Sequence, residues 1–339
     1  MIKTRITEML DIKYPIISAP MGPFYTTELT VAVSEAGGLG VLSHTNLMGK
    51  NSIKVMKKNL EYVIEHTDKP FGFNIRTARM QPDAMILVRN IAKWISKKPK
   101  LRDQCIYGVT SAGTPRKAAQ HWKKKAPSIK HFHVAPALWL ARKVVNSGCD
   151  GLVMTGTEGG GHQSYEGITT TILIQQAAKE LPDIPLVACG GFATPEGIAM
   201  ALAGGADAVA MGTRFIATNQ SEFHDNYKTL ILPATAKETV LTTGAFGPIR
   251  LLKNKYSIEH GKVLAKEDKI AQEAGFNLEE LEEQMEKYEL VYRGDVENGA
   301  VLVGQTIGLI DQLMDVDDLI TTFTYKAEEI LKKTVSKIS

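Results

Sequence analysis

Short apolar segments rich in Ile and Val recur eight times in the first 211 residues, most of them followed by a segment with helical spacing. They cover residues 16–19, 39–42, 71–75, 106–109, 129–134, 152–154, 186–189 and 208–211. Segments this short and apolar are typical of parallel strands buried on both faces. Eight strand–helix units in one series predict an α/β fold, namely a closed (β/α)8 TIM barrel, with a doubly wound open sheet as the alternative.

Turn residues support these boundaries. The pairs Gly37-Gly38, Ser147-Gly148 and Gly204-Gly205 precede the second, sixth and eighth strands, where glycine can supply a left-handed helix cap. Thr194 and Pro195 are typical of a helix start, with a capping side chain followed by proline at the first helical position.

The strand–helix alternation stops after the eighth strand. Residues 219–292 contain no convincing βα unit and include charged stretches such as residues 282–289. They predict an inserted helical lid domain over the barrel mouth. The apolar spacing returns through Val301, Ile307 and Ile310, which indicates that the closing helix of the barrel comes last. We therefore assign residues 1–218 and 293–339 to the barrel and 219–292 to the lid.

Charge and cysteine content exclude several classes of protein. Lys and Arg number 40 against 37 Asp and Glu, a net charge of +3, so neither a nucleic-acid nor a membrane partner is expected. No apolar segment is long enough to span a membrane, and the first residues lack a signal-peptide core. Three cysteines without CxxC spacing favour neither disulfides nor zinc. We expect a cytoplasmic protein that acts on a small molecule.

The loops after the last two strands contain glycine-rich turns. Gly190 and Gly191 follow the seventh strand, and Gly212 and Thr213 follow the eighth. Barrels commonly bind a phosphate at these two loops, where backbone amides approach the ligand closely. The pair of turns therefore predicts a phosphate site.

Two earlier loops suit a flat ring. Pro20, Met21 and Gly22 follow the first strand and are only weakly polar. Asn74, followed by Arg76, ends the third strand, and its amide can both donate to and accept from a heterocycle. An Asx turn is the alternative explanation for Asn74.

The loop after the sixth strand is the most unusual segment. Three glycines, residues 159–161, lead to His162, whose imidazole could transfer a proton at the barrel mouth. A flexible loop with an incidental histidine is the alternative. Glu158 is expected to cap this loop rather than to face the site.

Other reactive side chains are interpreted structurally. His131 and His133 lie on one face of the fifth strand without a third metal ligand, so packing or hydrogen bonding is expected. Cys149 and Cys189 are interpreted as small core residues rather than nucleophiles. No metal site is predicted.

Taken together, these loops resemble the nitronate monooxygenase (2-nitropropane dioxygenase) family of FMN-dependent barrels, which also includes NADH:quinone reductase and flavin-dependent enoyl-acyl-carrier-protein reductase relatives. The resemblance rests on residues 15–42, 70–75, 148–162, 185–218 and 294–310. It departs from the family at Gly159, where alanine is usual, and at Gln163 and Ser164, which follow the histidine.

The resemblance implies FMN at the barrel mouth. Residues carried over from it are expected near the flavin ring (Pro20, Met21, Gly22, Asn74), along the ribityl chain or phosphate (Gly160, Gly161) and at the phosphate (Gly190, Gly191, Gly212, Thr213). His162 matches the histidine that faces the flavin and the substrate, and is the candidate catalytic residue. A homodimer is compatible with this assignment.

Three functions follow. The leading hypothesis is a nitronate monooxygenase that oxidises alkyl nitronates with O2 to carbonyl compounds and nitrite. The second is a reductase of quinones or enoyl thioesters, with NADH or NADPH as electron donor. The third is a barrel that binds a phosphorylated ligand without catalysis.

Overall fold

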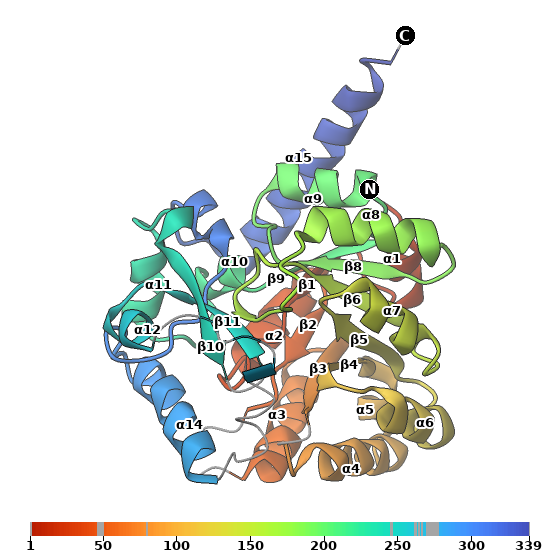
Figure 1. The fold of residues 1–339 in the computed structure, drawn as a ribbon. Helices are drawn as coiled ribbons and strands as arrows, with labels where there is room; N and C mark the ends of the chain where they lie inside the picture. The colour runs from red at the N-terminus through yellow and green to blue at the C-terminus, as the bar shows by residue number, and fades with distance from the viewer. Residues whose placement is uncertain are drawn as a thin grey trace.

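A computed structural model describes residues 2–45, 51–78, 81–244, 247–260, 263, 265, 267–268 and 278–338. Eight parallel strands surround one axis, with helices outside them (Figure 1). They are β1 (Ile16–Ser18), β2 (Gly40–Leu42), β3 (Phe71–Thr77), β4 (Cys105–Gly113), β5 (Lys130–Ala135), β6 (Gly151–Thr155), β8 (Leu186–Cys189) and β9 (Ala208–Met211). All eight predicted strands are confirmed.

The sheet closes on itself. Its order is β1-β9-β8-β6-β5-β4-β3-β2, and a parallel bridge between Ile17 and Leu39 joins the two end strands. Ser18 N donates to Leu39 O at 3.0 Å and Leu39 N donates to Ile16 O at 2.9 Å. The (β/α)8 barrel prediction is therefore confirmed, and an open doubly wound sheet is excluded.

Most helices lie outside the barrel. They are α2 (Thr27–Glu35), α3 (Ser52–His66), α4 (Ala84–Lys97), α5 (Pro99–Gln104), α6 (Arg116–Lys125), α7 (Leu138–Val145), α8 (Thr170–Glu180), α9 (Pro195–Ala203), α10 (Thr213–Ile216) and α15 (Val316–Val335). The predicted turn chemistry is present: Gly37, Gly148 and Gly205 have positive φ. The Thr194 side chain accepts from Gly197 N at the start of α9.

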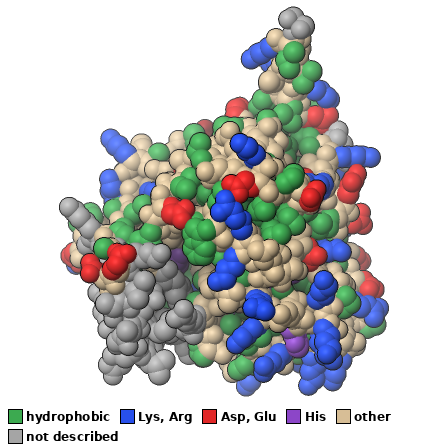
Figure 2. Space-filling view, turned by 45° about the vertical axis from the view of Figure 1, so that its right-hand side comes forward, with side chains coloured by type: hydrophobic (Ala, Val, Ile, Leu, Met, Phe, Trp, Pro, Cys, Tyr) green, Lys and Arg blue, Asp and Glu red, His purple; other side chains and the backbone are tan. Residues whose placement is uncertain are grey.

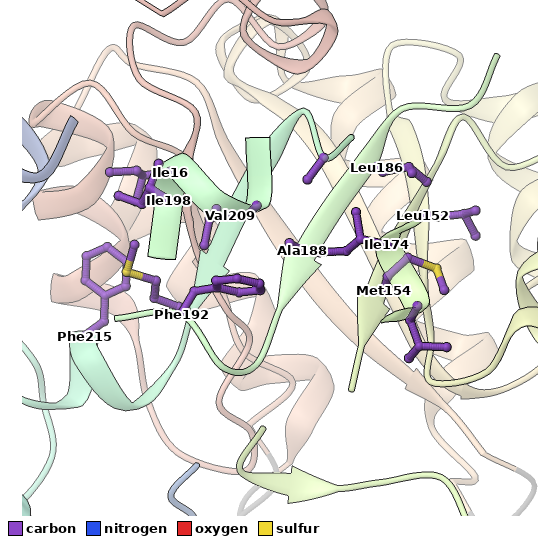
Figure 3. Close-up of a cluster of buried hydrophobic side chains, with 14 of the residues drawn as sticks. Ile16, Leu152, Met154, Ile174, Leu186, Ala188, Phe192, Ile198, Val209 and Phe215 are labelled. Atoms are coloured by element: carbon purple, nitrogen blue, oxygen red, sulfur yellow. The ribbon is translucent and has the colours of Figure 1, made fainter. Parts of the chain in front are cut away.

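Two apolar layers hold the barrel together. Inside it, side chains such as Tyr107, Phe132 and Val187 form one buried cluster with Ile6, from α1 (Arg5–Met9), and Leu10, which follows that helix. Outside it, strand residues pack against the helices, as Figure 3 shows for Leu152, Ile174 and Phe215 among others. These layers fix the strand ends from which the site is built.

The segment at residues 219–292 is not purely helical, so that part of the lid prediction is wrong. It contains α11 (Asp225–Ile231), η1 (Ala236–Glu238), β10 (Thr239–Gly244), β11 (Gly247–Leu252), α12 (Lys255–Glu259) and α14 (Leu278–Tyr292). Residues 245–246 and most of 261–277 lie outside the described residues. β10 and β11 form an antiparallel hairpin, and β11 also pairs with β7 (Gly161–His162) from the glycine loop.

The end of the chain returns to the barrel. Val301, Ile307 and Ile310 belong to a buried cluster that also includes Phe24 and Tyr227, so this stretch packs under the inserted segment. The closing helix is α15, whose apolar side chains lie in the outer barrel cluster. η2 (Gln305–Leu309) precedes it. The prediction that the closing helix comes last is confirmed.

Charged side chains of both signs are scattered over the face that Figure 2 shows. None of the described helices combines the length and apolar character needed to cross a bilayer. Among the residues that the structure describes, no three His, Cys, Asp or Glu side chains lie close enough together to hold a metal ion.

Candidate active site

A cavity opens at the carboxyl ends of the barrel strands, beneath the inserted segment. The residues predicted for the site all line it, namely Pro20, Met21, Gly22, Asn74, Gly160, Gly161, His162, Gly190, Gly191, Gly212 and Thr213. They come from β3 and from the segments that follow β1, β6, β8 and β9, which are far apart in sequence. The barrel geometry therefore brings the whole predicted set to one place, as the strand-end rule requires.

The glycines of the cavity differ in what their missing side chains leave room for. A Cβ at Gly161 would meet no protein atom within 4 Å, and one at Gly212 would meet none closer than 3.8 Å. A Cβ at Gly160 would lie 2.7 Å from Val303 C, and one at Gly190 would lie 2.8 Å from Gly159 Cα. Gly161 and Gly212 therefore leave space in the cavity, whereas Gly160 and Gly190 allow close backbone packing.

Asn74 and Thr213 are held by neighbouring groups. Asn74 Nδ2 donates to Val109 O at 3.0 Å and to Ser111 Oγ at 3.2 Å. These bonds use both amide hydrogens of Asn74, and its amide oxygen can only accept hydrogen bonds. The Thr213 hydroxyl accepts from Gly304 N at 2.9 Å. Thr213 thus anchors the returning end of the chain as well as lining the cavity.

The hairpin of the inserted segment holds His162. Within β7, Gly161 pairs with Arg250 and His162 pairs with Ile249 of β11. Gln163 N donates to Pro248 O at 2.7 Å. The histidine is therefore part of a three-stranded sheet rather than of a flexible loop.

Glu158 is not among the residues that line the cavity, as expected, but it caps a helix rather than its own loop. Its carboxylate accepts from Thr170 N at 2.8 Å and from Thr170 Oγ1 at 3.1 Å, at the first turn of α8. A carboxylate at a helix N-terminus is stabilised by the helix dipole. Glu158 O also accepts from Gln305 N at 2.8 Å, so this residue joins the glycine loop to the end of the chain.

Several lining residues were not assigned to the site from the sequence. Arg76 lies in β3, Gln81 follows that strand, and Tyr288 comes from α14. The alternation of side chains along a strand could have identified Arg76, because residues 74 and 76 share one face. No sequence signal places Tyr288, since its position depends on how the insertion packs. Burial raises the pKa of the Tyr288 hydroxyl, which keeps it protonated.

Cys189 differs in part from the expected core role, because it lines the floor of the cavity. Burial raises the pKa of its thiol to about 11, so it is not a thiolate near neutral pH. Its neighbour across the strands is Thr155.

The two histidines of β5 lie outside the cavity and share a hydrogen-bond partner. Thr110 Oγ1 is 2.8 Å from His131 Nε2 and 2.7 Å from His133 Nδ1. Burial lowers the pKa of both imidazoles to about 3. Cys149 Sγ lies 3.6 Å from His131 Nδ1, but burial raises its pKa to about 12, so the pair is neutral. The expectation of hydrogen bonding and packing at these positions is confirmed.

Comparison with known proteins identifies the family. The family model described as nitronate monooxygenase matches residues 3–326. The chain belongs to the nitronate monooxygenase family. It is therefore an oxidoreductase enzyme, which makes a purely ligand-binding barrel untenable.

Individual relatives carry different activities in their names. A nitronate monooxygenase of Paraburkholderia phytofirmans is 29% identical over 75% of this chain and 78% of its own length. The (3aS,4S,5R,7aS)-5-hydroxy-7a-methyl-1-oxo-octahydro-1H-indene-4-carboxyl-CoA dehydrogenase of Rhodococcus jostii is 32% identical over 76% of this chain and 69% of its own. Among solved structures, FabK from Thermotoga maritima is 32% identical, with a TM-score of 0.84 and complete coverage of both chains.

A nitroalkane oxidase of Streptomyces ansochromogenes is also similar in structure. It is 26% identical, with a TM-score of 0.76, and the match covers 97% of this chain and 99% of that one. The family is thus established. The names of the relatives, however, include both oxidation of nitro compounds and reactions of acyl thioesters.

Proposed function

We propose that this protein binds FMN in the cavity and oxidises alkyl nitronates with O2 to carbonyl compounds and nitrite. The observation that carries the proposal is the convergence of the glycine turns of β8 and β9, Asn74 and His162 on one cavity. Together with membership of the family, this convergence supports a flavin site and a reaction at its mouth.

The residues present fit FMN. The open space beside Gly161 and Gly212 gives a cradle that a Cβ would narrow. The phosphate would be held by the turns after β8 and β9, namely Gly190, Gly191, Gly212 and Thr213. The ribityl chain would lie along Gly160 and Gly161. The flavin ring would lie beside Pro20, Met21 and Gly22, with its polar edge hydrogen-bonded to Asn74. When bound, FMN would accept electrons from the substrate and pass them to O2.

His162 would act on the substrate. Its imidazole would donate a hydrogen bond to a nitronate oxygen, or take the α-proton from the carbon of a neutral nitroalkane. Pairing of β7 with β11 fixes its backbone, so little reorientation is needed during the reaction. The apolar walls, including Phe24, Ile216 and Phe223, would exclude water.

The proposal is tested by anaerobic stopped-flow absorption of the flavin-loaded protein. Propionate 3-nitronate is mixed in one series and NADH or NADPH in another. Flavin reduction by the nitronate, with both nucleotides inert, is the expected result. Rapid reduction by NADH or NADPH, with the nitronate inert, would overturn it.

A reductase of enoyl thioesters or quinones, with NAD(P)H as donor, is the second candidate. It is favoured by the full-length similarity to FabK and by the carboxyl-CoA dehydrogenase among the relatives. The same stopped-flow comparison separates the two candidates, because only the reductase requires a nicotinamide nucleotide to reduce the flavin.

Replacing His162 with Asn tests the catalytic role. We expect turnover of a neutral nitroalkane to fall by about 10²- to 10⁴-fold, the usual contribution of a general base, while FMN remains bound. Turnover of a nitronate should also fall, because the hydrogen bond from the imidazole is lost. Turnover is measured as nitrite release and flavin content by absorption. His66→Asn, an exposed position on α3, is the matched control and should behave as the wild type. Undiminished turnover in His162→Asn would remove this residue from the mechanism.

A further inference from the structure

A second hollow lies outside the barrel, where α3, α4 and α5 pack against one another (Figure 1). We call it the outer groove; it is lined by residues 57, 60–61, 93–94, 97–98 and 101. These residues are all different from those of the cavity at the strand ends. The volume of the outer groove is about 300 Å³, which is enough for a small ligand.

The floor of the outer groove is apolar. Leu60 and Leu101 are each 1% exposed and belong to the buried cluster between the barrel and these helices. Trp94 is half-buried and packs against the same cluster. A ligand in the outer groove would therefore contact apolar side chains.

Trp94 also offers an indole N–H to a ligand. Trp122 Nε1 donates to Val88 O at 3.0 Å, and Trp139 Nε1 donates to Glu166 Oε1 at 2.8 Å. Among the described residues, Trp94 Nε1 has no such acceptor. A half-buried tryptophan of this kind suits an aromatic ligand with an acceptor group, because it supplies both a ring and a donor.

The rim of the outer groove is positively charged. Four Lys side chains and the carboxylate of Glu61 line it, a net charge of +3. Glu61 is already paired, because Lys98 Nζ donates to its Oε1 and Lys57 Nζ lies 3.9 Å from the same atom. The hydrogen bond from Lys98 lowers the pKa of Glu61, which keeps it ionised. Lys93 and Lys97 have no carboxylate partner within the described part of the chain.

The spacing of these two lysines favours an anion between them. Lys93 and Lys97 are exposed and lie four positions apart on α4, so their side chains share one face of the helix. Like charges at this spacing destabilise a helix, and a bound anion would offset their repulsion. Trp94 lies three positions before Lys97, which places its ring beside the same anion.

We propose that the outer groove binds a small aromatic anion, with its carboxylate between Lys93 and Lys97 and its rings against Trp94 and the two leucines. Ammonium groups bind carboxylates through charge-assisted hydrogen bonds. The indole favours an aromatic partner, which packs on it by stacking or edge contacts. Because the outer groove is separate from the cavity, this site does not depend on the proposed function.

Calorimetric titration of the purified protein tests the charge requirement. The probes are 2-naphthoate and 2-naphthamide, which differ in charge but little in shape. We expect naphthoate to bind at least about tenfold more tightly, because only the anion makes charged contacts. Replacing Lys93 and Lys97 together with Gln should abolish this preference. Replacing Lys123 and Lys124 with Gln removes the same number of charges from α6 and should leave the preference unchanged.

Fluorine NMR locates the bound ligand. The chain contains three tryptophans, so 5-fluorotryptophan labelling gives three signals, among which Trp94→Phe identifies that of Trp94. We expect 2-naphthoate to shift the Trp94 signal, whereas Trp139, on α7, should be unaffected. An anion bound in the cavity instead would leave the Trp94 signal in place.

The aromatic requirement is tested with decahydro-2-naphthoate, which has the same charge but no aromatic ring and should bind less tightly than 2-naphthoate. Equal binding of the two anions would overturn the assignment to an aromatic ligand. An unshifted Trp94 signal, equal binding of naphthoate and naphthamide, or an unchanged preference after replacement of Lys93 and Lys97 would overturn the site itself.

Discussion

At the scale of single residues, the two departures from the family motif are physically linked. Gln163 is buried, and its Nε2 donates to Gly159 O at 2.7 Å. A Cβ at position 159 would lie 3.3 Å from that Nε2 and 3.4 Å from Gly190 Cα. The alanine that is usual at this position would therefore crowd the glutamine amide. Glycine at 159 makes room for a side chain that fixes the glycine loop.

A double-mutant cycle tests this link. Gly159→Ala and Gln163→Ala should each destabilise the protein by about 1 kcal/mol, a typical value for a lost or crowded hydrogen bond. Because the alanine methyl no longer meets the amide in the double variant, we expect a coupling energy of about 0.5 kcal/mol or more. Urea unfolding of the four proteins measures it. Gln175→Ala, on the exposed face of α8, should be additive with Gly159→Ala. Additivity in the Gln163 cycle would contradict the linkage.

At the scale of elements, the hairpin β10–β11 connects the inserted segment to the glycine loop of the cavity. Its strands pair along their length, from Thr239 with Leu252 to Gly244 with Gly247. Arg250 extends this connection: its Nε donates to Thr157 O and its Nη1 to Thr239 Oγ1, each at 2.8 Å. The hairpin therefore fixes both the loop before the glycines and the strand that carries His162.

Gly244→Ala should disturb the histidine without removing it. A Cβ at position 244 would lie 2.9 Å from His162 Nε2 and 2.9 Å from Ile249 Cβ, which is too close for either. We expect nitrite release to fall at least about tenfold, because small displacements of a catalytic group are costly, while FMN stays bound. Gly197→Ala in α9, where the nearest atom would be 3.4 Å away, is the control. Equal activity of the two variants would show that the hairpin does not position His162.

The same hairpin shows where sequence analysis succeeded and where it did not. Each barrel strand carries a local signal, an apolar run bounded by turn residues. The rule that strand ends form the site then predicted Asn74 and His162, which both line the cavity. The hairpin has β-branched residues and glycines typical of such turns, but it lies between charged stretches that favoured helix. Its pairing with residues 161–162 joins segments far apart in the chain, which no local pattern reveals. The same holds for Tyr288.

At the scale of the whole molecule, the net charge is nearly balanced, but the charged residues are unevenly distributed along the chain. Residues 89–143 contain fourteen Lys and Arg but a single Asp, a local charge of +13, so the rest of the chain carries −10 within the total of +3. These residues belong chiefly to α4, α5, α6 and α7. In Figure 2, Lys and Arg side chains gather over the lower part of the molecule, where Figure 1 places α4 and α6. One side of the barrel is therefore positively charged.

This polarity predicts that retention on a cation exchanger depends on where a charge lies and not only on the net charge. Lys123, Lys124 and Lys125 end α6 on the basic side, whereas Lys326, Lys333 and Lys337 lie at the exposed end of the chain. Replacing either set with Gln removes the same three charges. Because a resin binds the side with the highest local potential, the α6 variant should elute at lower salt than the other. Co-elution of the two variants at neutral pH would mean that the basic side does not determine how the protein binds to the resin.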